Sequence, residues 1–376
     1  MPRLLYPISV VIIIANLFII TSCIAAIDVS GPLVITKPGT YELSSDIYLK
    51  NNSVFFDIRS SDVILDGKSH TIDHLTSPLT SSQTSGVKIA GINRELQNVS
   101  VMNIKVNNFS KGISAEKLKR GYINKILLFG NTKGISILNS SSVTITMSDI
   151  IGSVGKSQSL TEGIYLENVK DALITDNLLE KQSSGGIELK NSKNITMGGN
   201  WIDINNGAGI SLDKTTQGLI VNNYLNNTMN TRILGDSNAT WNFEKRNGPN
   251  IMNGPYAGGN YWASPDGKGF SQQCNGRGDG FCNESYILNA QNKDNLPLTL
   301  IYIKPLPDQA LPPTDPDKDG LYKDINGNGK KDYEDIVLDF QYLDWIRDNE
   351  PLNYFDFDRN GKIDYEDVVT LFSDIG

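Results

Sequence analysis

The sequence lacks a basic segment, and charged residues make up only 20% of its 376 residues. Hydrophobic residues make up 39%, and the remainder is rich in Gly, Asn, Ser and Thr. This composition excludes a collagen, a coiled coil, a polytopic membrane protein and a wholly disordered chain. Because no run of Lys and Arg is present to neutralise phosphates, the sequence predicts no nucleic-acid partner.

The net charge of −8 is unevenly distributed along the chain. Residues 315–376 contain 17 acidic and 7 basic side chains, whereas the rest of the chain contains 25 acidic and 27 basic ones. The acidity therefore belongs to a small C-terminal module, and the larger N-terminal part is close to neutral.

Residues 1–26 have the pattern of an export signal. Arg3 precedes an apolar run over residues 4–20, and the small residues Ala25 and Ala26 follow. Three outcomes stay open: cleavage, lipid attachment at Cys23, or retention as a membrane anchor. Each of them predicts a secreted or cell-surface protein that meets a membrane only through this segment.

Export changes the interpretation of the remaining cysteines, Cys274 and Cys282. Two cysteines eight positions apart in an exported loop predict a disulfide. Eight N-x-S/T sequons also fit an exported glycoprotein. They begin at Asn51, Asn98, Asn108, Asn139, Asn194, Asn226, Asn238 and Asn283.

A repeated motif decides the architecture of residues 27–243. A Gly followed by Ile or Val recurs at Gly86, Gly112, Gly134, Gly163, Gly186 and Gly209. Short segments of alternating polarity separated by polar turns cannot bury a face alone, but stacked repeats bury a continuous core. The sequence therefore predicts a mainly β fold, a right-handed parallel β-helix of about seven or eight coils.

Two sets of residues recur at equal spacing, once in each of three successive repeats. Asn177, Asn200 and Asn223 are expected to stack inside the β-helix, where their amides bond to one another along its axis. Glu167, Lys190 and Asp213 are expected to form an outward column of alternating charge.

Three segments follow the repeats. Residues 244–304 are rich in Gly and Asn, contain the cysteine loop, and are expected to cap the open end of the β-helix. Residues 305–314 form a Pro-rich linker. Residues 315–376 form the acidic module.

The segments IRSSDVILDGKSHTID and GGNYWASPDG, with the Gly-Ile repeats between them, resemble NosD-type right-handed β-helix proteins. This group, also called carbohydrate-binding and sugar-hydrolase repeats, is common among exported archaeal surface proteins. The resemblance covers residues 33–300, and it implies copper binding during nitrous oxide reductase maturation. The chain departs from that function, because His70 and His74 are its only histidines and it has no Met- or His-rich cluster.

The terminal module contains two copies of one pattern, DINGNGKKDYEDIVLDF at 324–340 and DFDRNGKIDYEDVVTLF at 356–372. Each copy matches a calcium-binding loop of the EF-hand type, with oxygen ligands at fixed positions and a Gly at the sharp turn. The predicted ligands, with Lys330 and Lys362 at the backbone-carbonyl position, are Asp324, Asn326, Asn328, Lys330, Asp332, Asp335, Asp356, Asp358, Asn360, Lys362, Asp364 and Asp367. Two calcium ions are expected, and Asp315, Asp317 and Asp319 offer carboxylates for a third.

The module resembles a dockerin, in which Asp replaces Glu at the last loop position and the entering helix is missing. The resemblance implies a small α-helical domain that docks onto a cohesin-like or other cell-surface protein through residues 315–376. In dockerins, two positions of each loop help to choose the partner. Here they are Tyr333-Glu334 and Tyr365-Glu366 instead of the usual Ser/Thr pairs.

Two classes of function compete for the β-helix. Trp201 and Tyr224 each follow a ladder Asn in successive repeats and are candidates for binding a polysaccharide, which favours a glycan-binding, adhesive or scaffold protein. The alternative is a polysaccharide lyase or glycoside hydrolase. Glu162, Glu188 and Asp203 fall at different offsets in their repeats, so the sequence assigns no catalytic residue and favours a non-enzyme.

Overall fold

The computed structural model describes residues 25–50, 54–75, 84–152, 161–276, 279–300, 303–317 and 319–375. Most of the predicted signal peptide and the sequon at Asn51 lie outside these residues. The chain forms two compact units. The first unit comprises Met1–Glu244, Gly258–Gln273 and Ser285–Pro297, and the second comprises Lys245–Ala257, Cys274–Glu284 and Leu298–Gly376.

The first unit is a parallel β-helix built from three sheets, A, B and C, which hold ten, nine and nine strands among the described residues. Sheet A contains β1 (Ile27–Val29), β3 (Gly39–Leu43), β6 (Val63–Asp66), β9 (Leu96–Met102), β12 (Leu118–Asn124), β15 (Thr144–Thr146), β18 (Lys170–Thr175), β21 (Lys193–Gly198), β24 (Gly218–Val221) and β27 (Ala239–Thr240). Sheet B contains β2 (Leu33–Ile35), β5 (Val54–Ile58), β8 (Ser85–Ala90), β11 (Lys111–Glu116), β14 (Lys133–Leu138), β17 (Glu162–Glu167), β20 (Gly185–Lys190), β23 (Ala208–Asp213) and β26 (Met229–Leu234). Sheet C contains β4 (Ile47–Leu49), β7 (Thr71–His74), β10 (Lys105–Asn107), β13 (Leu127–Phe129), β16 (Asp149–Ile151), β19 (Leu178–Glu180), β22 (Trp201–Asp203), β25 (Tyr224–Asn226) and β30 (Tyr261–Ala263).

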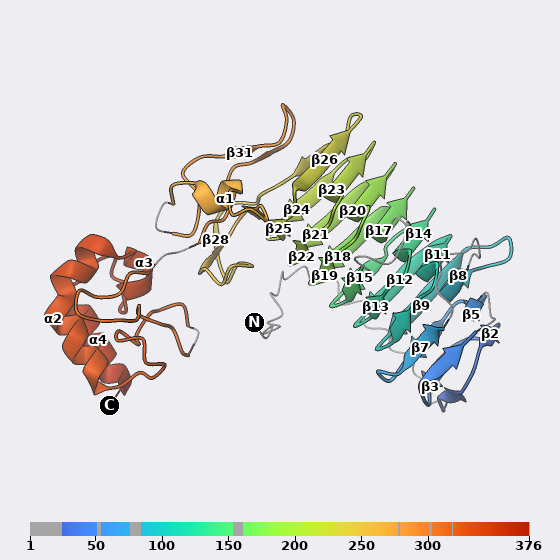
Figure 1. The fold of residues 1–376 in the computed structure, drawn as a ribbon, viewed down its shortest axis with the longest axis horizontal. Coiled ribbons are helices and arrows are strands. Elements are labelled where there is room, and N and C mark those ends of the chain that lie inside the picture. Colours follow the sequence, from blue (N-terminus) through green and yellow to red (C-terminus); the bar gives the residue numbers. More distant parts are fainter. Residues whose placement is uncertain are drawn as a thin grey trace. The chain divides into compact units, whose positions relative to one another are not determined.

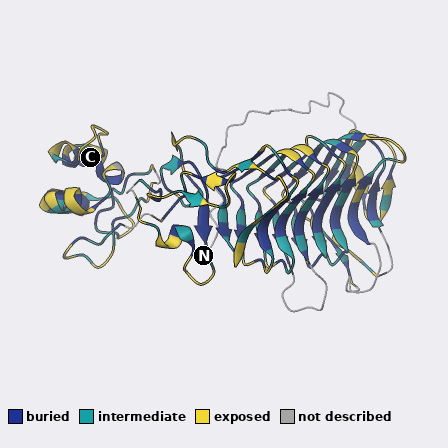
Figure 2. Cartoon of the chain, turned by 90° about the horizontal axis from the view of Figure 1, so that it is seen from above, coloured by how far each residue is buried: buried dark blue, intermediate teal, exposed yellow. Residues whose placement is uncertain are grey.

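Each coil contributes one strand to each sheet, and the strands stack in sequence order (Figure 1). In the coil of β20, β21 and β22, the inward residues Ile187, Met197 and Ile202 are almost completely buried. Their register partners one coil later are also apolar: Ile187 lies opposite Ile210, and Met197 lies opposite Ile220. Figure 2 shows the resulting band of buried strand residues along the β-helix. The predicted fold class is confirmed.

The predicted asparagine ladder is confirmed as well. Asn177 Nδ2 donates to Asn200 Oδ1 at 3.0 Å, and Asn200 Nδ2 donates to Asn223 Oδ1 at 2.9 Å. The same amide nitrogens also donate to backbone carbonyls, such as that of Ile174 at 2.8 Å from Asn200. Because all three side chains are fully buried, these bonds replace the water that the amides would otherwise require.

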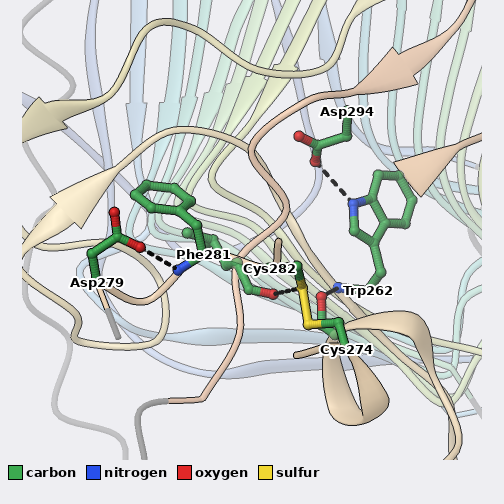
Figure 3. The surroundings of a disulfide bond; sticks show 8 residues. Trp262, Cys274, Asp279, Phe281, Cys282 and Asp294 are labelled. Carbon is green, nitrogen blue, oxygen red and sulfur yellow. Dashed lines mark hydrogen bonds between the residues drawn. A yellow bond between two sulfur atoms is a disulfide. The ribbon is translucent and has the colours of Figure 1, made fainter. Parts of the chain in front are cut away.

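The β-helix continues into the segment predicted to be its cap. Strand β30 pairs with β25 in sheet C, and Asn260 extends the asparagine ladder by accepting from Asn223 Nδ2 at 2.9 Å. The ladder ends at the buried carboxylate of Asp294, which accepts from the backbone nitrogen of Asn260 and from Trp262 Nε1 at 2.9 Å (Figure 3). Helix α1 (Phe270–Gln273) and strands β31 (Tyr286–Ile287) and β32 (Lys293–Asp294) complete this end.

The second unit contains the strands β28 (Arg246–Asn247) and β29 (Tyr256–Ala257) and the helices α2 (Tyr333–Asn349), α3 (Leu352–Phe355) and α4 (Tyr365–Ile375). In this unit the structure joins Cys274 and Cys282 by a disulfide. Ile303 and Leu306 pack into the core formed with the helices. The start of the predicted linker is therefore part of the packed unit, because Leu306 supplies apolar surface that the small module needs.

Candidate functional site

The first predicted calcium loop is folded around Asp324, a fully buried residue. Its two carboxylate oxygens accept from the backbone nitrogens of Asn328 at 3.1 Å and Gly329 at 2.8 Å. Gly329 has a φ of +85°, which side chains other than glycine rarely tolerate. The glycine of the motif therefore serves the sharp turn that brings the ligand positions together.

The second loop repeats this geometry around Asp356. Its carboxylate accepts from Asn360 N at 2.9 Å and Gly361 N at 2.8 Å, and Gly361 has a φ of +87°. Oxygen atoms of Asp356, Asp358 and Asp367 lie within 4.8 Å of one another. The sequence repeat is thus also a repeat of structure.

The last ligand position of each loop links the loop to the helix that follows it. Asp335 Oδ2 accepts from Asp332 N at 2.8 Å, and Asp367 Oδ2 accepts from Asp364 N at 2.8 Å. In the first loop Asp332 also caps α2 by accepting from Glu334 N. Burial raises the pKa of the Asp335 and Asp367 carboxyls. A bound cation would offset that cost, so the all-oxygen donor sets of both loops fit calcium.

The three carboxylates proposed for a third ion also lie close together. Each of Asp315, Asp317 and Asp319 places one carboxylate oxygen within 4.8 Å of the other two. Lys331 Nζ lies 3.3 Å from Asp317, and Lys323 Nζ lies 2.7 Å from Asp319. Lysine ammonium groups therefore already compensate part of this charge.

The outer surfaces of α2 and α4 carry the same apolar side chains at the same spacing. Each helix has a Tyr, a Val four positions later and a Phe three positions after that, and all six are exposed. They are Tyr333, Val337 and Phe340 in α2, and Tyr365, Val369 and Phe372 in α4. The Phe340 and Tyr365 ring centroids are 5.7 Å apart, so the two sets join into one surface, here called the helix-pair face. Glu334 and Glu366, predicted partner-recognition residues like the tyrosines beside them, are exposed next to it.

On sheet C, the predicted glycan-binding pair forms part of a stack of three rings. Trp201 and Tyr224 are 3.7 Å apart between centroids and nearly parallel, and Tyr224 and Tyr261 are 5.4 Å apart and parallel within 7°. Both faces of the Tyr224 ring are therefore covered, and burial raises its pKa to about 12. On the side of Trp201 away from Tyr224, its register partner one coil earlier is Leu178, and both side chains are half-buried.

A polar column runs beside the aromatic stack. Asp203 follows Trp201 by two positions, lies opposite Glu180 and Asn226 in the register, and accepts from Asn226 Nδ2 at 2.8 Å. Burial is the main cause that raises the pKa of Asp203, and the nearby charge of Glu180 raises it further. This column places hydrogen-bonding groups next to the exposed part of Trp201.

Two of the three carboxylates considered for catalysis belong to sheet B. Glu162 and Glu188 lie on adjacent strands but three register positions apart, because Glu162 lies opposite Gly185, whereas Asp203 belongs to sheet C. Between them, the Tyr165 hydroxyl donates to Glu167 Oε2 at 2.8 Å. Burial, followed by the hydrogen bond and the surrounding carboxylates, raises the pKa of Tyr165. The predicted alternating column is present here too, with Lys190 Nζ 3.3 Å from Glu167.

The two histidines occupy separate environments in the first unit. His70 Nδ1 lies 3.1 Å from Asp46 Oδ1, and the buried His74 ring packs against Phe109 at 5.4 Å between centroids. Within the described residues, no histidine belongs to a group of three side chains able to hold a metal ion.

A comparison with protein families identifies the family of this β-helix. A family model described as periplasmic copper-binding protein (NosD) matches residues 45–267, more than half of the sequence. The chain belongs to this family. Its residues do not fit the copper binding that the NosD description names, because among the described residues neither histidine belongs to a group of three His, Cys, Asp or Glu side chains able to hold a metal ion. No curated protein matches the sequence.

Solved structures similar to this NosD-family chain are β-helix proteins. The DFA-IIIase of Arthrobacter chlorophenolicus A6 has 14% identity and a TM-score of 0.41, and the match covers 47% of this chain and 42% of that one. The enzymatically active domain of tailspike protein 2 from bacteriophage CBA120 has 16% identity and a TM-score of 0.35, with coverages of 57% and 43%. The Streptococcus pneumoniae surface protein and adhesin PfbA has 14% identity and a TM-score of 0.38, with coverages of 56% and 62%. The chain thus spans less than two thirds of each of these proteins.

Most of the helix-pair face was not predicted, although the sequence contains a signal for it. Val337 and Val369, and Phe340 and Phe372, are separated by the same interval as the two calcium loops. Their exposure could not be read from that repeat, because apolar residues at helical spacing usually face a core. In the described part of the chain, no helix combines the length and apolar character that crossing a membrane requires.

Proposed function

We propose that this NosD-family chain is an exported cell-surface protein that docks onto a partner protein through its calcium-loaded terminal module. The observation that carries the proposal is the double repeat in that module. The two calcium loops repeat each other, and the helices that follow them present the same three exposed apolar side chains. Monomeric proteins rarely expose a contiguous apolar surface of this kind without a partner.

The partner that fits is a cohesin-like domain or another cell-surface protein. Its contact surface would be apolar at the centre, to cover Val337 and Phe340, and basic at the edge, opposite Glu334 and Glu366. Calcium controls the interaction because α2 and α4 each begin at a loop whose last ligands, Asp335 and Asp367, are fully buried.

The test is calorimetric titration of the full chain with a panel of cohesin domains, in calcium and in chelator. Val337→Asp combined with Val369→Asp should weaken binding at least about tenfold, since each change places a charge in an apolar contact. Val34→Asp is the matched control, because Val34 is 50% exposed on the β-helix. Binding that survives both the chelator and the double substitution would refute docking through this face.

For the β-helix, we propose glycan binding at the sheet C surface around Trp201. The exposed part of Trp201, which lies between Leu178 and Tyr224 in the register, would contact the apolar side of a sugar ring, while Asp203 and Glu180 accept hydrogen bonds from its hydroxyl groups. A glycan array probed with the wild-type chain and with Trp201→Ala tests this role. If the variant retains the wild-type pattern, glycan recognition does not depend on this stack.

Glycan cleavage on sheet B is the second candidate function. It is favoured by Tyr165, a protonated hydroxyl placed among the carboxylates of Glu162, Glu167 and Glu188. Incubation with a polysaccharide panel should then release new reducing ends or unsaturated products, and Glu188→Gln should reduce the rate. If no polysaccharide in the panel is cleaved, the binding role is favoured.

A further inference from the structure

A row of cations lies on sheet A, although the sequence contains no basic run. Lys119, Ser141, Lys170, Lys193 and Thr216 occupy successive positions in the strand register. Lys170, Lys193 and Thr216 recur at the spacing of the asparagine ladder, whereas the intervals from Lys119 to Ser141 and from Ser141 to Lys170 differ from it. The row spans four register steps, about 19 Å at roughly 4.8 Å per step.

The ammonium groups of this row have no carboxylate partner within the described part of the chain. Lys170 and Lys193 are exposed and lie directly opposite each other in the register, an arrangement that repels. Neither they nor Lys119 form an ion pair or a side-chain hydrogen bond with any described residue. Asp171, the carboxylate next to Lys170, accepts instead from Asn194 Nδ2 at 2.6 Å.

Further cations flank the row. Arg120 follows Lys119, and its guanidinium donates to amide oxygens of Asn98 and Gln97 at 2.7 and 2.6 Å. These neutral acceptors leave its charge uncompensated. Lys117 and Lys214 are exposed at the turns that enter sheet A, with Glu116 and Asp213 before them. The column on sheet B differs, since its Lys133 and Lys190 are paired with glutamates.

We propose that this row, defined by Lys119, Lys170 and Lys193 with Arg120 beside it, binds an acidic polysaccharide lying along the axis of the β-helix. A linear polyanion would remove the repulsion between Lys170 and Lys193 and would meet cations on several coils in turn. Ser141 and Thr216, which occupy register positions of the row, can bond the hydroxyl groups of sugars. This alternation of charged and neutral polar groups suits a uronic-acid polymer, which carries both carboxylates and hydroxyl groups. A nucleic acid fits less well, because the row itself contains no aromatic side chain on which bases could stack.

The site does not depend on the docking role proposed above. It lies in the β-helix, and the helix-pair variant Val337→Asp/Val369→Asp should bind uronate oligomers as the wild-type chain does. Failure of the docking experiment and failure of this one can therefore be told apart.

The test is calorimetric titration of the full chain with oligogalacturonate, with a neutral galactan oligomer of equal length and with single-stranded DNA. Wild-type protein should bind oligogalacturonate and not the neutral oligomer, and its affinity should fall as NaCl rises from about 0.05 to 0.2 M. Lys170→Glu/Lys193→Glu should weaken binding at least tenfold. The control, Lys88→Glu/Lys105→Glu, makes the same charge change at exposed positions of sheets B and C and should stay within about twofold.

A second variant distinguishes a loss of binding from a failure to fold. Lys170→Gln/Lys193→Gln removes the repulsion without adding charge, so it should fold at least as well as the wild type and still lose most of its affinity. Unchanged affinity in this folded variant would overturn the proposal. Equal binding of the neutral oligomer, or of single-stranded DNA, would overturn it as well.

Discussion

Asp339 of α2 occupies the position that Leu371 occupies in α4, one repeat of the module later. Both side chains are buried, with 1% and 0% of their surface exposed. Leu371 belongs to the apolar core of the second unit, whereas Asp339 Oδ2 has no hydrogen-bond partner among the described residues. Burial, and then the charges of Asp367 and Asp335, raise the pKa of Asp339 to about 7. One half of the repeat thus carries an acid where the other half carries a leucine.

We predict that Asp339→Leu stabilises the second unit. The folded-state pKa of Asp339 is raised, so its contribution to stability is fully present below about pH 4 and is lost as the pH rises to about 7. The advantage of the variant should therefore grow over this interval and reach about 1–3 kcal/mol at pH 8. Urea unfolding in saturating calcium, followed by far-UV circular dichroism, measures it. Asp344→Leu, at an exposed position of α2, should change stability by less than about 0.5 kcal/mol.

The β-helix should be sensitive to a single amide in its ladder. Asn200→Leu removes the side-chain oxygen that accepts from the backbone nitrogen and Nδ2 of Asn177, and it takes from Asn223 Oδ1 one of its two donors. The loss of these buried bonds should cost roughly 1–3 kcal/mol. Thermal unfolding compares it with Asn206→Leu, a change at an exposed asparagine in the turn after β22. Equal melting temperatures for the two variants would show that the ladder contributes nothing to stability.

Calcium should fill the second loop first and should be required for the helices to form. The second loop offers carboxylates at Asp356, Asp358, Asp364 and Asp367, whereas the first offers three, and affinity rises with carboxylate number. In calorimetric titrations of the full chain, Asp356→Ala should abolish the tighter binding step and Asp324→Ala the weaker one.

The matching control for calcium is Asp344→Ala, because this side chain is 86% exposed and outside both loops. It should leave both binding steps unchanged. Chelator should remove the helical contribution to the far-UV spectrum, because the buried carboxylates of a small module repel one another without metal. A helical signal that persists in chelator would contradict the coupling of metal binding to folding.

The disulfide should be fully formed in protein that has been exported. Alkylation before and after reduction, followed by mass spectrometry, should detect no free thiol at Cys274 or Cys282 until reductant is added. Reduction should lower stability by up to about 2–3 kcal/mol, because the bridge restricts a short loop of the unfolded chain. Alkylation of both cysteines without reductant would contradict the prediction.

Several parts of this protein follow from local spacing along the chain. The equal spacing of Asn177, Asn200 and Asn223 sets the length of the later coils and places these residues at an inner corner, since one inward position per coil must stack on the next. The calcium loops are equally local, because each loop holds all of its ligands in one short continuous segment.

The tertiary structure determines which outward-facing side chains lie next to one another. The spacing predicted that Trp201 and Tyr224 stack, but Tyr261, from a segment predicted to be a cap, covers the second face of Tyr224. The separation of Asp203 from Glu162 and Glu188 depends on which sheet each strand joins. Lys170 and Lys193 share the spacing of the asparagine ladder, but Lys119 joins their row only through coils of unequal length, which no fixed period reveals. Local spacing determines the inward-facing residues because every coil must bury apolar side chains against the coil before it. Outward-facing residues can vary, so which of them lie together depends on how the coils stack.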